Sequence, residues 1–330
     1  MVGGGRTPDA PSIATTPASE VLRRLELAVT RRLDGLLQGD HRGLTPGHGT
    51  EQGEVRGYQP GDDVRRIDWN VTARLRETHV RDTVADRELE TWVLVDTSAS
   101  LAFGSARAEK RDLALAAVAA VGFLTLRTGN RIGAVTTDGA GTHVTVPARG
   151  GRVHGQALLR QVLGAFGQPR PGAADLGPAM RRLGGLARRR GLVVVVSDFL
   201  DPGEWTAPLR SLAMRHDVLG IEIVDPLEVE LPDAGSVHLV DPETGAELEV
   251  RTDPALRARY ADAARSQRAD IARRLRTAGA DHLQLRTDRD WLLDLARFVS
   301  HRRDRVDALS RAAAHGHDAT TSARLHGASR

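Results

Sequence analysis

The chain has 330 residues, of which 40% are hydrophobic and only 3% aromatic, and it carries 46 Lys and Arg against 43 Asp and Glu. This length is enough for one large folded domain or two smaller ones, and the absence of cysteine excludes disulfides, thiolate metal sites and cysteine nucleophiles. The net charge of +3 is carried by residues 301–330, and a formally neutral remainder with few aromatic side chains argues against nucleic-acid binding.

The first ninety residues are expected to hold little regular structure. Residues 1–18 are rich in Gly, Pro, Ser and Thr, which is typical of a disordered leader, and they lack the apolar core of a signal peptide. Apolar residues three and four apart predict a helix over about 20–37. Residues 40–90 predict an irregular, β-containing segment with short strands near 54–58 and 78–84. We treat residues 19–90 as one N-terminal segment.

From residue 91 onwards, predicted strands and helices alternate. The apolar runs that predict strands are TWVLVD, RIGAVTTD, HVTVP, LVVVVSD, DVLGIEIVD and HLQLRT, and VHLVDPETGAELEV predicts a hairpin. Helices are predicted near 107–128, 152–166, 175–189, 203–215, 254–278 and after residue 290. This alternation predicts an α/β fold with a doubly wound, mostly parallel sheet over residues 91–303. Residues 304–330 form a predicted polar tail.

No stretch of the sequence predicts a membrane span. The longest apolar candidate, residues 113–126, is shorter than the roughly 18–20 residues that a spanning helix needs. We therefore expect a cytoplasmic protein.

Acidic and hydroxyl side chains follow two of the predicted strands. Asp96, Ser98 and Ser100 come at the end of the first strand, and Asp198 comes at the end of the valine-rich strand. The carboxyl ends of strands in an open α/β sheet border the crevice in which ligands bind, and oxygen ligands favour Mg²⁺, Mn²⁺ or Ca²⁺. These residues therefore predict a site for a divalent cation. The alternative is that Asp96 and Ser98 only cap the turn and helix that follow.

A second polar block lies in the N-terminal segment. Its Pro-Gly dipeptide predicts a turn whose amides can be bonded by the aspartates that follow, and its arginines are close enough in sequence to pair with its aspartates around a tryptophan anchor. Two interpretations stay open, a structural ion-pair network that holds the segment to the α/β domain and a partner-binding surface. The residues concerned are Tyr58, Pro60, Gly61, Asp62, Asp63, Arg65, Asp68, Trp69 and Arg74.

Both motifs resemble known families. DTSAS at 96–100, with SD at 197–198, resembles the metal-ion-dependent adhesion site of von Willebrand factor A domains. The block GYQPGDDVRRIDWN at 57–70 closely resembles the signature of the bacterial "domain of unknown function 58" family, and this resemblance covers about residues 20–303. It implies a von Willebrand factor A-like fold with Asp96, Ser98, Ser100 and Asp198 as cation ligands. Ala174 stands where a threonine ligand is usual, so we expect weaker binding, with Asp175 as the alternative ligand.

The resemblance also implies a function. It indicates a non-enzymatic protein-binding adaptor that acts with a MoxR-type AAA+ ATPase in the maturation or remodelling of a client protein, with Mg²⁺ or another divalent cation as cofactor. No His, Cys or Lys motif lies near the four candidate ligands in the sequence, so we expect no catalytic base or nucleophile beside them. The alternative is a metal-dependent hydrolase or phosphotransferase that uses Asp96, although Ser98 stands where DxDxT phosphatases carry a second aspartate.

Overall fold

The computed structural model of the chain describes residues 18–36, 55–59, 64, 67–75, 77–81, 89–106, 108–167 and 172–302. The chain divides into two compact units, a larger one from Met1–Thr45 with Leu89–Arg330 and a smaller one from Pro46–Glu88. The predicted leader, apart from Ala18, and the predicted polar tail lie outside the described residues.

A six-stranded sheet forms the centre of the larger unit. Its strand order is β10-β7-β6-β3-β4-β5, and every neighbouring pair is parallel except β4 with β5. Numbered along the chain, this order is 3-2-1-4-5-6 from β5 to β10, as in doubly wound folds. The prediction of a doubly wound, mostly parallel sheet is confirmed. The strands are β3 Glu90–Asp96, β4 Arg131–Asp138, β5 Gly141–Arg149, β6 Gly191–Ser197, β7 Asp217–Val224 and β10 Asp281–Arg286.

The valine run of β6 lies in the interior of the sheet, between β3 and β7. Val193 and Val195 pack into the apolar cluster on one face, and Val194 and Val196 pack into the cluster on the other. Successive side chains of a strand point to opposite faces, and a parallel strand covered on both faces needs apolar residues at every position. The run of valines therefore fixes β6 at the centre, next to the strand that ends at Asp96.

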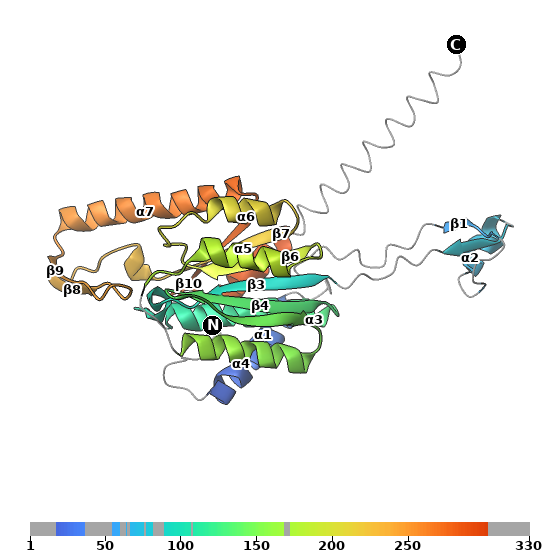
Figure 1. Cartoon of the computed structure of the whole chain (residues 1–330), viewed down its shortest axis with the longest axis horizontal. Coiled ribbons are helices and arrows are strands. Elements are labelled where there is room, and N and C mark those ends of the chain that lie inside the picture. Colours follow the sequence, from blue (N-terminus) through green and yellow to red (C-terminus); the bar gives the residue numbers. More distant parts are fainter. Residues whose placement is uncertain are drawn as a thin grey trace, which may run out of the picture. The chain divides into compact units, whose positions relative to one another are not determined.

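Helices cover both faces of the sheet (Figure 1). One layer contains α1, α3, α4 and the helix at 291–302, and the other contains α5, α6 and α7. α3 is buried along most of its length, and its first residue, Lys110, is one of its buried residues. The helices are α1 Ala18–Leu36, α3 Lys110–Arg127, α4 Arg152–Phe166, α5 Leu176–Leu186, α6 Thr206–Ala213 and α7 Pro254–Thr277.

The N-terminal helix α1 belongs to the larger unit. Val21, Leu25, Val29 and Leu33 are spaced four apart and form a buried face of α1 in the same apolar cluster as α3 and α4. The sequence groups this helix with the segment up to residue 90, whereas the structure divides the chain differently. The reason is that the apolar stripe of α1 is buried against the α/β unit.

The smaller unit contains a short antiparallel pair, β1 Val55–Gly57 with β2 His79–Arg81, and the helix α2 Trp69–Leu75. Asp68 caps α2, since its Oδ1 accepts hydrogen bonds from the backbone N of Asn70 at 3.1 Å and of Val71 at 3.2 Å.

Trp69, the predicted apolar anchor of the block, is 71% exposed, and among the residues that the structure describes in this unit Val80 is the buried one. The anchor role of Trp69 stays a prediction. Tyr58 and Arg74 are also exposed. The other residues of the polar block, Pro60, Gly61, Asp62, Asp63 and Arg65, lie outside the described residues.

The predicted hairpin forms a separate two-stranded sheet in the larger unit. β8 Ser236–Val240 pairs antiparallel with β9 Glu247–Arg251. Two short 3-10 helices, η2 Ala99–Ala102 and η3 Pro226–Glu228, follow β3 and β7. Within the described ranges, we find no helix with the length and apolar character needed to cross a bilayer.

Candidate metal centre

The candidate site lies where the strand order of the sheet reverses. From β3 the chain continues to β4 on one side, while β6 lies on the other side of β3. Loops that leave such neighbouring strands in opposite directions open a crevice, and doubly wound folds bind ligands there. Asp96 is the last residue of β3 and Asp198 is the first residue after β6, so the topology brings both carboxylates to this point.

Asp96 gathers two hydroxyl groups around its carboxylate. Its Oδ1 accepts hydrogen bonds from Ser98 N at 2.9 Å and from Ser98 Oγ at 2.6 Å, and its Oδ2 accepts one from Ser197 Oγ at 2.7 Å. Ser98 Oγ lies 3.0 Å from Ser100 Oγ, and all four side chains are buried. Because Ser98 donates its proton to Asp96, the lone pairs of its oxygen are left to face another donor or a cation.

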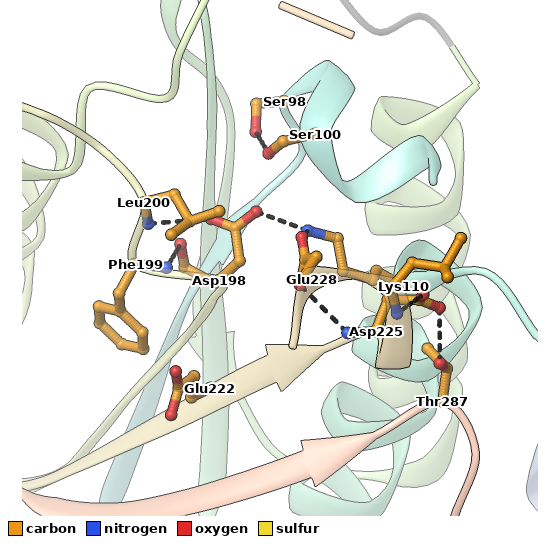
Figure 2. A network of polar contacts seen from close by, with 12 residues as sticks. Ser98, Ser100, Lys110, Asp198, Phe199, Leu200, Glu222, Asp225, Glu228 and Thr287 are labelled. Atoms are coloured by element: carbon orange, nitrogen blue, oxygen red, sulfur yellow. Dashed lines mark hydrogen bonds and ion pairs between the residues drawn. The ribbon is translucent and has the colours of Figure 1, made fainter. Parts of the chain in front are cut away.

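Asp198 is paired with the only lysine of the chain (Figure 2). Lys110 Nζ donates to Asp198 Oδ2 at 2.8 Å and to Glu228 Oε1 at 2.5 Å, and the lysine side chain is fully buried. A lysine thus lies beside the candidate ligands, although no local motif predicts it. The physical reason is that α3 follows β3 and begins at the same edge of the sheet, so that its first side chain enters the site.

Burial and charge shift the pKa values of the two aspartates in opposite directions. Burial, and then the negative charge of Asp198, raise the pKa of Asp96 to about 7 despite its hydrogen bonds. Burial acts in the same direction on Asp198, but the Lys110 ammonium outweighs it and holds the pKa of Asp198 below its usual value. Burial opposes the charged form of Lys110, yet the carboxylates of Asp198 and Glu228 raise its pKa. Lys110 thus stays charged and satisfies Asp198, whereas Asp96 is bonded only to amide and hydroxyl groups.

A second buried cation supports this arrangement. Arg268 of α7 donates to Asp198 O at 3.3 Å and to Glu222 Oε1 at 3.2 Å. It also donates to Glu228 Oε2 at 3.1 Å, so Glu228 bridges Lys110 and Arg268. Breaking one buried ion pair leaves an uncompensated charge, which costs about 3–5 kcal/mol. The network therefore ties α7 and η3 firmly to the loop that follows β6.

The loop before α5 does not supply the missing hydroxyl. Ala174 is buried in the apolar cluster on the α5 face of the sheet, and Asp175, the alternative ligand, is exposed. The first turn of α5 is capped instead by Asp201, whose Oδ2 accepts a hydrogen bond from Leu176 N at 2.9 Å. Ala174 therefore offers no side-chain oxygen to a cation, and the Asp175 carboxylate makes no capping hydrogen bond to α5.

The donor set suits a hard cation. Carboxylate and hydroxyl oxygens are the ligands that Mg²⁺ and Mn²⁺ prefer. Burial, and then the negative charge of Asp198, raise the pKa of Asp96, and a cation beside the two carboxylates would stabilise the ionised form of Asp96. In the part of the chain that the structure describes, no three His, Asp or Glu side chains are grouped as a metal site. A cation here would therefore depend on the hydroxyls of Ser98 and Ser100.

Sequence reasoning did not identify the buried cations of this site. Lys110 lies 88 residues before Asp198, and Arg268 lies 70 residues after it. A single lysine among many arginines is a signal, because its compact ammonium and the planar guanidinium of arginine are not interchangeable in a buried ion pair. Arg268 and Glu228 carry no such signal, since the chain contains many residues of both types.

Comparison with known proteins gives a family match. The family model described as "Protein of unknown function DUF58" matches residues 54–270. An uncharacterised protein of Mycobacterium tuberculosis is 53% identical over 282 residues, which are 86% of this chain and 89% of that protein. An uncharacterised protein of Mycobacterium avium is 49% identical over 158 residues, which are 48% of this chain and 94% of that protein.

Solved structures with a similar fold are distant in sequence. BatB from Bacteroides thetaiotaomicron is 12% identical with a TM-score of 0.42, over 66% of this chain and 99% of that chain. An aerotolerance-related membrane protein from Bacteroides fragilis is 13% identical with a TM-score of 0.43, over 64% and 97% of the two chains. The SpRpn10 VWA domain is 15% identical with a TM-score of 0.36, over 63% and 93%. At these identities the likeness concerns the fold alone.

Proposed function

The chain belongs to the family described as "Protein of unknown function DUF58", and on that premise we propose that it is a non-enzymatic adaptor that binds other proteins. The binding surface is the Asp96 face, which we define as Asp96, Ser98, Ser100 and Asp198 at the carboxyl edge of β3 and β6. These residues would hold Mg²⁺ or another divalent cation as a weakened metal-ion-dependent adhesion site. The cation would attract an acidic side chain of the partner.

The observation that carries this proposal is the state of Asp96. A buried carboxyl group with a pKa of about 7 beside the charged Asp198 destabilises the fold when it ionises, unless a positive charge arrives. Asparagine at this position would keep an acceptor for Ser98 N but would lose the acceptor for Ser197 Oγ, which donates to Oδ2. Perturbed carboxyl groups of this kind are typical of functional sites.

The contacts of Lys110 support binding rather than turnover. A general base or an amine nucleophile must be neutral for part of the time, whereas Lys110 is buried between two carboxylates that raise its pKa. Asp96 is a poor nucleophile as well, because both of its oxygens accept hydrogen bonds and the side chain is buried. The raised pKa of Asp96 does not distinguish the adaptor from the alternative, a metal-dependent hydrolase or phosphotransferase, because perturbed carboxyl groups occur in both kinds of site.

We extend the proposal to the partners that the family resemblance implies. The adaptor would act in the cytoplasm with a MoxR-type AAA+ ATPase and a client protein, without nucleic acid. The Asp96 face suits such a role because its carboxylates and hydroxyls are held on rigid strand ends.

The proposal is tested by measuring binding of the chain to a MoxR-type ATPase from the same genome. Binding is measured once with Mg²⁺ in excess and once with a chelator that removes divalent cations. We compare wild type with Asp96→Asn, which keeps the shape of the side chain, and with Asp262→Asn, a matched change at an exposed aspartate of α7. Binding should fall with chelator and with Asp96→Asn only, while circular dichroism stays unchanged. If neither the chelator nor Asp96→Asn weakens binding, the interface lies elsewhere on the protein. If the wild-type chain hydrolyses phosphoesters in the presence of Mg²⁺ and Asp96→Asn does not, the protein is an enzyme and the adaptor proposal is wrong.

A further inference from the structure

Arginine side chains gather at the amino edge of the central sheet, opposite the Asp96 face. β6 and β7 are parallel neighbours, and their register pairs Leu192 with Asp217, so the residues that precede the two strands lie at the same edge. Three consecutive arginines lead directly into β6 and another lies two residues before β7, and all four side chains are exposed. The exposed residues of this region, which we call the arginine edge, are Leu186, Arg188, Arg189, Arg190, Met214 and Arg215.

The two halves of the arginine edge form one continuous surface. Leu186 is the last residue of α5, and Met214 directly follows α6. Arg215 Nη2 donates a hydrogen bond to Gly184 O at 3.2 Å, which joins the ends of the two helices. Gly184 permits this approach, because a Cβ at this position would lie 3.3 Å from Leu212 Cδ2 and from Arg215 Nη2. The exposed side chains at the two helix ends are therefore neighbours.

The positive charge of this surface is largely uncompensated. Residues 176–197 and 205–216 hold seven arginines and neither aspartate nor glutamate. Of the four arginines at the edge, Arg189 alone has a carboxylate partner among the described residues, Glu90 at 4.0 Å. A cation near a helix C-terminus complements the helix dipole, but this effect falls off within the last turn. Three arginines beyond the end of α5 therefore exceed what the helix requires, and they favour an anionic partner.

Apolar side chains are exposed within this positive surface. Met214 is 82% exposed and Leu186 is 36% exposed. A nucleic-acid backbone would offer Met214 no apolar contact, and the arginine edge has no aromatic ring on which bases could stack. The surface of an anionic bilayer offers phosphate groups to arginine and an acyl boundary to apolar side chains. This combination of charge and exposed apolar side chains thus fits an anionic lipid surface.

We propose that the arginine edge docks the protein on an anionic lipid surface. The arginines contact the lipid phosphates, and Met214 and Leu186 enter the boundary between headgroups and acyl chains. β6 contains seven residues, so its two ends lie about 20 Å apart. Docking through the amino edge therefore leaves the Asp96 face directed away from the lipid and open to other proteins. The inference does not rest on the proposed function, because it uses residues of the opposite edge.

The test is co-sedimentation of the full chain with lipid vesicles, in the presence of chelator and without any ATPase. The vesicles contain either phosphatidylcholine alone or equal parts of phosphatidylglycerol and phosphatidylcholine. We expect the chain to bind the mixed vesicles only. Binding should weaken strongly between about 0.1 M and about 1 M salt, because the Debye length shortens from about 10 Å to about 3 Å.

Single substitutions identify the surface that binds. Arg188→Gln and Arg190→Gln should each weaken binding to the mixed vesicles about fivefold. Met214→Gln leaves the charge unchanged and should also weaken binding about fivefold, since an apolar contact is lost. The matched control is Arg259→Gln, an equal change of charge at an exposed residue of α7. Its neighbour Tyr260 donates a hydrogen bond into η3, beyond the carboxyl end of β7, so the control should bind as wild type does.

Hydrogen exchange locates the contact. The mixed vesicles should slow amide exchange at 186–190 and 214–216 and leave the hairpin tip at 241–245 unchanged. The proposal fails if wild type does not bind the mixed vesicles, or if Arg259→Gln weakens binding as much as Arg188→Gln. It also fails if Met214→Gln binds vesicles as wild type does while duplex DNA or an acidic peptide protects 186–190, because the surface then recognises another macromolecule. A chain that binds the vesicles but not the ATPase would disprove the proposed function alone.

Discussion

Replacing Lys110 with methionine tests the buried ion pairs on which the description of the site depends. Methionine fills a similar volume without the ammonium, so the main effect is electrostatic. Lys110 pairs with Asp198 at 2.8 Å and with Glu228 at 2.5 Å, but Glu228 keeps Arg268 at 3.1 Å. Only Asp198 is then left without its ion-pair partner, and we expect the free energy of unfolding to fall by about 3–5 kcal/mol, the cost of breaking one buried pair.

Urea unfolding followed by circular dichroism measures this loss. With a denaturant slope of about 3 kcal/mol per M, the midpoint should fall by about 1–1.7 M. Arg265→Met, on α7, is the control, because Arg265 pairs with Asp262 on the exposed surface and should contribute only about 0–1 kcal/mol. Adding Asp198→Asn to Lys110→Met should restore part of the stability, since both charges are then removed.

Two results would refute this reasoning. If Lys110→Met costs no more than Arg265→Met, the buried pairs do not stabilise the fold as described. If the double variant is less stable than Lys110→Met by the full cost of a second change, the two charges are not coupled.

Three other predictions follow from the same site. In the presence of chelator, the stability of wild type relative to Asp96→Asn should fall as the pH rises from about 4 to about 7. The folded state keeps Asp96 protonated up to a pKa of about 7, whereas the unfolded chain releases that proton near 3.8. A difference in urea midpoints that stays constant across this pH range would contradict the prediction. Mn²⁺ at about 100 times its dissociation constant should raise the melting temperature of wild type by about 5–10 °C and leave Asp96→Asn unchanged. Asp225→Ala should cost about 3 kcal/mol or more in urea unfolding, since this buried carboxylate accepts hydrogen bonds from Ser105 N, Leu227 N and Thr287 Oγ1, and Asp233→Ala, an exposed change, should cost little.

The elements of the fold were largely predictable because the buried residues of a helix or strand recur at a regular spacing in the sequence. The valines of β6 and the evenly spaced apolar residues of α1 predict their elements directly. Boundaries are less well determined. α5 ends at Leu186 and not near 189, and residues 189–190 form the bend that leads into β6.

The site was predictable only where its residues are local. Asp96, Ser98 and Ser100 lie within five residues, and the structure brings them together with Asp198 because both strands end at the same edge of the sheet. Lys110 reaches Asp198 through the packing of α3, and Arg268 reaches it through the packing of α7. No local pattern encodes these long-range contacts, so they become visible only in the folded chain.

The burial of Lys110 also determines how the protein reacts chemically. It is the only lysine in the sequence, and its amine lies between two carboxylates with no exposed surface, so the folded α/β unit offers no lysine amine to reagents in solution. Acylating cross-linkers, acetyltransferases and ligases that attach protein tags to lysine would reach this amine only after the start of α3 has separated from the sheet edge. Modification at Lys110 would therefore mark molecules whose Asp96 face has opened, and a lysine-directed degradation signal would select unfolded copies over folded ones.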